Sequence, residues 1–124
     1  MSFVARYLTD KDDLNSDGTP KRRAFTPRPA KGTERLELSV CDLDDRTEQE
    51  LLEAGQMVAA ARGKILLGRS EISKAFVVKQ ELTLERNDHP FRGHTNIVGW
   101  STTRDAYLLT AMAFSKNAGP LIAM

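Results

Sequence analysis

The chain has 124 residues, of which 40% are hydrophobic and 28% are charged, and its formal net charge at pH 7 is +1. This length suits one domain, and the absence of any run of about 18 apolar residues argues against a transmembrane helix. Cys41 is the only cysteine, so an internal disulfide and a cysteine-based zinc cluster are excluded.

Residues 1–6 lack the basic start, apolar core and small-residue cleavage site of a secretory signal. Together with the single cysteine, this favours a reducing compartment, and we expect a cytoplasmic protein with no membrane association. Two histidines without a committed carboxylate fall short of a three-ligand metal site. We therefore predict no metal and no cofactor.

The positive charge is concentrated near the N-terminus. Residues 18–31 hold five cations and no acid, whereas residues 34–124 hold eleven basic and thirteen acidic side chains, a balance of −2. The five cations are Lys21, Arg22, Arg23, Arg28 and Lys31. Residues 10–33 also contain three prolines and two glycines, which predicts an extended arm that Phe25 docks onto the body. Residues 2–9 suit one turn of helix.

The first periodic segment of the body is residues 35–41, in which leucine and valine alternate with polar side chains as in a half-buried strand. Thr47 and Glu50 have the spacing of a capping box, which predicts a helix that ends near Gly63. The apolar residues 65–67 suit a strand or a buried loop.

Ser70 is expected to cap a second, short helix. Residues 81–85 alternate and predict a strand, and residues 94–100 predict another. A serine or threonine directly after that strand begins the last helix, which stops near Asn117.

These elements predict an α/β (α+β) fold, with an irregular arm over residues 1–33 and a single small domain over residues 34–124. The domain is expected to contain a three- to four-stranded mixed sheet, with about three helices packed on one face.

Residues 13–24 match the first half of a calcium-binding loop, with oxygen ligands available at Asp13, Asn15 and Asp17. The twelfth position, Ala24, lacks the glutamate that such a loop requires. We predict a turn here and no calcium site.

The basic arm, residues 20–31, has two interpretations. Its mobile cations suit the phosphates of a nucleic acid, and Phe25 offers a stacking surface. Alternatively, the arm is a solvated linker, packs on its own acidic body, or becomes ordered only against a partner protein. A nucleic acid or a protein is therefore the candidate partner, and the oligomeric state stays open.

Arg69 and Ser70 fall at the start of the predicted short helix. Free backbone N–H groups and the helix dipole suit an anion there, and an arginine can hold it through two parallel hydrogen bonds. An ordinary helix cap beside an exposed arginine explains the same residues, because every helix start has such donors.

Residues 89–100 contain both histidines, an arginine, an asparagine and the only tryptophan. Strand alternation places His94 and Asn96 on one face, about 7 Å apart. With His89 nearby, two imidazoles suit general acid and general base catalysis of phosphodiester cleavage, and Arg92 suits the phosphate. In the structural alternative, the histidines only form hydrogen bonds and the tryptophan belongs to the core.

Three motifs occur together in the chain: Leu38-Ser39-Val40, Gly68-Arg69-Ser70-Glu71 and His94-Thr95-Asn96-Ile97-Val98-Gly99-Trp100. They resemble a family of small uncharacterised bacterial proteins whose most specific motif is His-x-Asn-Ile-x-Gly-Trp. The resemblance covers residues 34–113, with departures at Ser70, Thr95 and Ser101. It implies a bacterial cytoplasmic protein without a known activity.

The motifs are consistent with two functions. The first is a non-enzymatic module that binds an anionic ligand or a partner through Arg69, Ser70, Arg92, His94 and Asn96. The alternative is a small metal-independent nuclease that uses His94 and His89. Whether the protein is an enzyme stays open, as does the role of residues 119–124.

Overall fold

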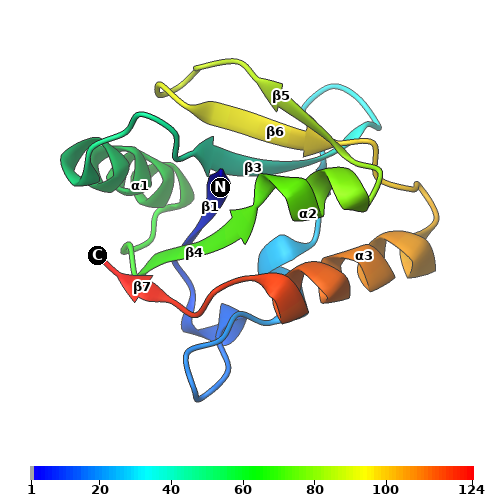
Figure 1. Cartoon of the computed structure of the whole chain (residues 1–124), viewed down its shortest axis with the longest axis horizontal. Coiled ribbons are helices and arrows are strands. Elements are labelled where there is room, and N and C mark those ends of the chain that lie inside the picture. Colours follow the sequence, from blue (N-terminus) through cyan, green and yellow to red (C-terminus); the bar gives the residue numbers. More distant parts are fainter. Residues whose placement is uncertain (1) are drawn as a thin grey trace.

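The computed structural model describes residues 2–124. The elements in chain order are β1 (Phe3–Leu8), η1 (Lys11–Asp13), η2 (Arg22–Phe25), β2 (Arg28–Pro29), β3 (Leu36–Asp42), α1 (Glu48–Arg62), β4 (Gly68–Ser73), α2 (Lys74–Lys79), β5 (Thr83–Arg86), β6 (His94–Val98), α3 (Arg104–Asn117) and β7 (Ile122–Ala123). Seven strands form one antiparallel sheet with the order β5-β6-β3-β1-β4-β7, and β2 pairs with the start of β3 (Figure 1).

The predicted α+β class is confirmed, but the expected three- to four-stranded mixed sheet is wrong. The largest difference lies at the N-terminus, where the expected turn of helix over residues 2–9 is instead the inner strand β1, between β3 and β4. Phe3 to Leu8 therefore lie within the sheet and not in the arm expected over residues 1–33. Arg6, on the same side of the strand as two apolar residues, interrupts the pattern that would have predicted a strand.

Helices cover both faces of the sheet, which corrects the expectation of helices on one face (Figure 1). On one face, α2, α3 and η2 pack over a core that includes Leu38, Ile97 and Phe114. On the other face, α1 packs through Leu51 against Tyr7. The molecule thus has three layers, and α1 alone forms the helical part of one of them.

The predicted capping box of α1 is confirmed: the Thr47 hydroxyl accepts from the backbone N–H of Glu50, and the Glu50 carboxylate accepts from the N–H of Thr47. The helix ends at Gly63, whose φ of 65° is left-handed. Within the helix, a Cβ on Gly55 would lie 2.8 Å from the ring of Tyr7. Glycine at this position therefore allows α1 to lie close to the sheet.

The expected helix cap at Ser70 is wrong, because residues 68–73 form β4 and Ser73 caps α2. Ser70 is fully buried, and its hydroxyl donates to the carbonyl of Gly119 over 2.6 Å. This contact satisfies the buried hydroxyl, so a polar residue is tolerated at an inward position of the strand.

The remaining N-terminal segment, residues 9–33, is largely irregular but packed. Phe25 is 1% exposed and its ring lies 5.9 Å from that of Phe114, which confirms the predicted docking. The calcium-like segment closes as a turn, in which the N–H of Asn15 donates to the carbonyl of Thr19. At the other end of the chain, β7 pairs with β4.

No helix within residues 2–124 is long and apolar enough to cross a membrane.

Candidate anion-binding site

Strands β1 and β3 separate soon after they begin to pair. β1 pairs with β3 only through Val4 and Ala5, and the start of β3 pairs with β2 instead. Arg6 lies in the resulting gap, where Nε donates to the carbonyl of Ala24 and Nη1 donates to the carbonyl of Ser39, both over 2.9 Å. The guanidinium group is therefore held in a fixed position by two neutral acceptors.

A second guanidinium group reaches the same place from the last residue of α1. Arg62 Nη1 donates to the carbonyl of Tyr7 and to the hydroxyl of Thr9, each over 3.2 Å. Within residues 2–124, no carboxylate oxygen lies within 4.0 Å of the side-chain nitrogens of Arg6 or Arg62. Two cations thus meet without an acidic partner.

The electrostatics of this pair are unfavourable in the free protein. Burial, and then the charge of Arg62, lower the pKa of Arg6 to about 9, although Asp13 acts in the opposite direction. Burial also lowers the pKa of Arg62, again against the effect of Asp13. Because the charged form of each arginine is destabilised, an anion bound between them would relieve part of that cost.

Two hollows meet at this pair, and we call them together the Arg6–Arg62 groove. They share Arg6, Ser39 and Arg62. The first hollow, the apolar half, has a volume of about 360 Å³ and is lined further by Tyr7, Val40, Met57, Val58, Phe91 and His94, among others. The second, the polar half, has a volume of about 650 Å³ and is lined further by Thr9, Asp10, Asp13, Arg23, Arg28, Glu37 and Lys64, among others.

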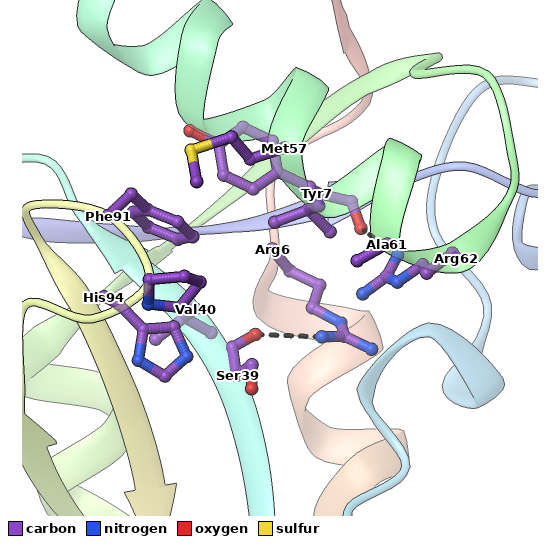
Figure 2. Close-up of a pocket in the computed structure, with 11 residues that line it drawn as sticks. Arg6, Tyr7, Ser39, Val40, Met57, Ala61, Arg62, Phe91 and His94 are labelled. Carbon is purple, nitrogen blue, oxygen red and sulfur yellow. Dashed lines mark hydrogen bonds between the residues drawn. The ribbon is translucent and has the colours of Figure 1, made fainter.

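Figure 2 shows how the apolar half is arranged around the arginines. Phe91 and His94 lie on one side, and the guanidinium groups of Arg6 and Arg62 lie on the other. The side chain of Met57 reaches the same hollow from α1. A ligand in this half would therefore touch apolar or aromatic groups at one end and cations at the other.

Each carboxylate of the polar half has a cation within 4.0 Å. Arg23 lies 2.7 Å from Asp13 and 3.5 Å from Asp10, and Glu37 pairs with Arg35. The other cations of this half are Arg28 and Lys64, and neither has a carboxylate within 4.0 Å in residues 2–124. The positive potential of the groove therefore extends beyond the central pair.

His94 forms the rim of the apolar half from strand β6. Its Nδ1 lies 2.6 Å from Oδ1 of Asn87, so Nδ1 carries the proton and Nε2 is left as an acceptor. The imidazole also meets the ring of Phe91 edge to face, with 5.4 Å between the centroids. Burial lowers the pKa of His94, Glu37 raises it and His89 lowers it further, so the neutral form prevails near pH 7.

The residues that the sequence predicted to bind a ligand do not all lie at the Arg6–Arg62 groove. Arg69 is 5% exposed and pairs with Glu48 and Glu71 over 3.0 and 2.9 Å, and the hydroxyl of Ser70 is bonded to the backbone. Both residues hold β4 in place, and neither lines the Arg6–Arg62 groove. The predicted helix start at these residues does not exist, because they lie within a strand.

Of the predicted cluster at residues 89–100, His94 lines the groove. Asn96 reaches it indirectly, because its amide oxygen accepts from the hydroxyl of Ser39 over 3.3 Å. His89 and Arg92 do not line it, and the side chain of Arg92 is 64% exposed and lies 3.5 Å from Glu50. The tryptophan belongs to the core, since Trp100 is 7% exposed.

The predicted basic arm contributes to the groove through two of its five cations. Arg23 and Arg28 both line the polar half, and Arg23 pairs with the two aspartates there. Lys21, Arg22 and Lys31 are exposed. Within residues 2–124, no group of three or more histidine, cysteine or acidic side chains is placed to hold a metal ion.

Sequence reasoning missed the two arginines at the centre of the groove. Arg6 could have been noticed only if residues 3–8 had been predicted as a strand, in which it shares an inward face with Val4 and Leu8. A charged residue at such a position needs an unusual environment. Arg62 offers no comparable signal, because a basic residue in the last turn of a helix is ordinary.

Comparison of the chain with protein-family models, curated proteins and solved structures gave no match.

Proposed function

We propose that this protein is a non-enzymatic module that binds a small organic anion in the Arg6–Arg62 groove. The observation that carries the proposal is the pair of guanidinium groups at the junction of the two hollows. Each is held by neutral acceptors, and neither is paired with a carboxylate of residues 2–124. This keeps the anion-binding function expected from the sequence. It replaces Arg69 and Arg92, the arginines expected to hold the anion, with Arg6 and Arg62.

Several guanidinium N–H groups of Arg6 and Arg62 are not used within the protein, and they support this assignment. Arg6 uses Nε and Nη1 within the protein, and Arg62 uses Nη1. The other guanidinium N–H groups of both residues have no hydrogen-bond acceptor within residues 2–124. Such planar sets of donors match the oxygens of a carboxylate or a phosphate, and fixed donors bind an anion with little further loss of entropy.

The metal-independent nuclease, the alternative predicted from the sequence, has weaker support. Acid–base cleavage of a phosphodiester needs two groups that flank one phosphate. Of the two histidines, only His94 lines the groove, although His89 lies near enough for its charge to lower the pKa of His94. We expect no cleavage when the protein is incubated with short RNA and DNA oligonucleotides, and metal-free cleavage that is lost in both His94→Gln and His89→Gln would favour the nuclease.

The binding proposal can be tested by NMR titration of ¹⁵N-labelled protein with phosphate, acetate and benzoate. We expect saturable shifts of the Arg6 and Arg62 side-chain Nε–H signals and of the backbone signals of Tyr7 and Ser39. Arg6→Gln or Arg62→Gln should weaken binding at least about tenfold, because a hydrogen bond to a charged group contributes about 1.5–3 kcal/mol.

Arg104→Gln is the matched control, since Arg104 is an exposed cation on α3, in the layer opposite to α1. This variant should bind each anion like the wild type. Failure of all three anions to shift these signals would contradict the proposal, and so would equal losses in Arg104→Gln and Arg6→Gln.

A further inference from the structure

The apolar half of the groove is lined on one side by flat groups. Phe91 and His94 stand edge to face, with an interplanar angle of 90°. Pro90 also lines this hollow. Tyr7 lies under α1 at the same hollow (Figure 2). A flat ring that enters here can stack on one of these faces or meet another edge-on, which are the two arrangements that aromatic rings prefer.

Met57 adds a sulfur to the same hollow. It reaches the hollow from α1 and is 46% exposed although it is a large apolar residue. A thioether makes favourable contacts with the edge of an aromatic ring and adapts its shape to the ring that it covers. The residue is therefore suited to close over a bound ring, and a ligand would bury surface that the free protein leaves in water.

The size of the apolar half limits what can occupy it. Its volume of about 360 Å³ lies at the lower end of the range of about 300–1,000 Å³ that small-molecule sites cover. A compact ring system fits such a space, whereas a long alkyl chain would extend out of it. The ring would also lie next to the cationic pair, because Arg6 and Arg62 line this same hollow.

We infer that the ligand of the Arg6–Arg62 groove is an aromatic anion, in which a flat ring occupies the apolar half and a carboxylate or phosphate attached to it meets Arg6 and Arg62. This inference rests on the proposed function and names the chemical class of the ligand. His94 contributes a specificity element, since its Nε2 offers an acceptor to a ring that carries a hydrogen-bond donor.

The test compares three carboxylates of equal charge by NMR titration or calorimetry: benzoate, cyclohexanecarboxylate and acetate. Benzoate should bind at least about tenfold more tightly than acetate, because the ring buries apolar surface. It should also bind about threefold more tightly than its saturated analogue, because only the flat ring stacks on Phe91 and His94.

Phe91→Leu removes the aromatic face and keeps an apolar side chain of similar bulk. In this variant, the preference for benzoate over cyclohexanecarboxylate should be smaller than in the wild type, because only His94 remains for stacking, while acetate binds as in the wild type. Phe76→Leu, in the opposite layer of the molecule, is the control and should keep the wild-type ratio.

The outcomes separate the two proposals. If benzoate and cyclohexanecarboxylate bind wild type equally, or if Phe91→Leu leaves their ratio unchanged, the aromatic class is wrong and anion binding stands. If none of the three carboxylates nor phosphate binds, the proposed function fails, and the inference about the ring fails with it.

Discussion

Two arginines on neighbouring strands have opposite surroundings. Arg69 on β4 is 5% exposed, and it contacts Glu48 over 3.0 Å and Glu71 over 2.9 Å. Arg6 on β1 is half-buried, and its partners are the carbonyls of Ala24 and Ser39. One arginine is neutralised by carboxylates, and within the described residues the other is held only by neutral acceptors.

The pKa values of these two arginines move in opposite directions. Burial lowers the pKa of Arg69, but hydrogen bonds to Glu48 and Glu71 raise it to a net value above the usual one. Burial, and the charge of Arg62, lower the pKa of Arg6 to about 9. A buried arginine with carboxylate partners thus serves the fold, whereas one without them can accept an anion from outside.

The largest effect that we expect is a loss of stability in Arg69→Met, which removes the arginine that pairs with carboxylates. The free energy of unfolding should fall by about 2 kcal/mol, because hydrogen bonds to charged groups are worth about 1.5–3 kcal/mol. The loss stays below that of a fully buried pair because the side chain of Glu48 is 78% exposed and returns to water. Urea denaturation measures the change.

Benzoate affinity serves as the control in this variant, and it should be unchanged in the folded protein. Glu48→Gln should cost less than Arg69→Met, because Glu71 still pairs with Arg69. Wild-type stability of Arg69→Met would show that the ion pairs do not distinguish the two arginines.

A carboxylate placed in the groove should act on Arg6 and Arg62 as Glu48 and Glu71 act on Arg69. Met57→Glu places an acidic group in the wall of the hollow that Arg6 and Arg62 line. It should compete with the ligand, so benzoate affinity should fall about tenfold, or about 1.4 kcal/mol. Stability should change by less than about 1 kcal/mol, because the new ion pair is partly exposed.

Met57→Gln has nearly the same shape and no charge, so it should retain most of the affinity that Met57→Glu loses. Calorimetric titration of both variants measures this difference directly. Equal losses in the two variants would mean that the shape of the hollow, and not its charge, limits binding.

The predictable parts of the fold are those with local causes. The capping box at Thr47 and Glu50 begins helix α1, and the left-handed Gly63 ends it. Each of these signals involves only residues within one helical turn, so the sequence alone identified the helix. The alternation within β3 was equally clear, because its inward residues are apolar and its neighbours are polar.

The missed strands depend on partners that are distant in the sequence. In β4, Ser70 is satisfied by a carbonyl 49 residues away, and Arg69 by Glu48, 21 residues away. In β1, the guanidinium of Arg6 contacts a carbonyl 33 residues away. A polar residue at an inward position looks like a break in a strand until its partner is known.

The candidate site also has a part that local sequence predicts and a part that it does not. The unusual composition of residues 89–100 pointed to His94, which does line the groove. Arg62 contacts the carbonyl of Tyr7 across 55 residues of sequence, and this contact exists only after α1 has packed on the sheet. The centre of the site is therefore a product of tertiary packing.

The smallest effect we expect is a pH dependence of binding through His94. The charged and titratable groups around it are Glu37 on β3, His89 in the preceding loop, and Arg6 and Arg62 across the hollow. In the free protein, burial keeps the pKa of His94 below 6.5, and a bound anion favours the imidazolium and raises that pKa. By linkage, the contribution of His94 to affinity is constant above the pKa of the bound state and rises as the pH falls through that pKa.

Benzoate is a suitable probe because carboxylic acids titrate near pH 4 and it stays ionised from pH 5.5 to 8. A rise of about half a pH unit in the pKa of His94 corresponds to about threefold tighter binding at the acidic end. His94→Gln should remove this dependence, and His89→Gln should keep it, because His89 does not line the groove. A slope that survives in His94→Gln would assign the titration to another group near the groove and would contradict the role given to His94.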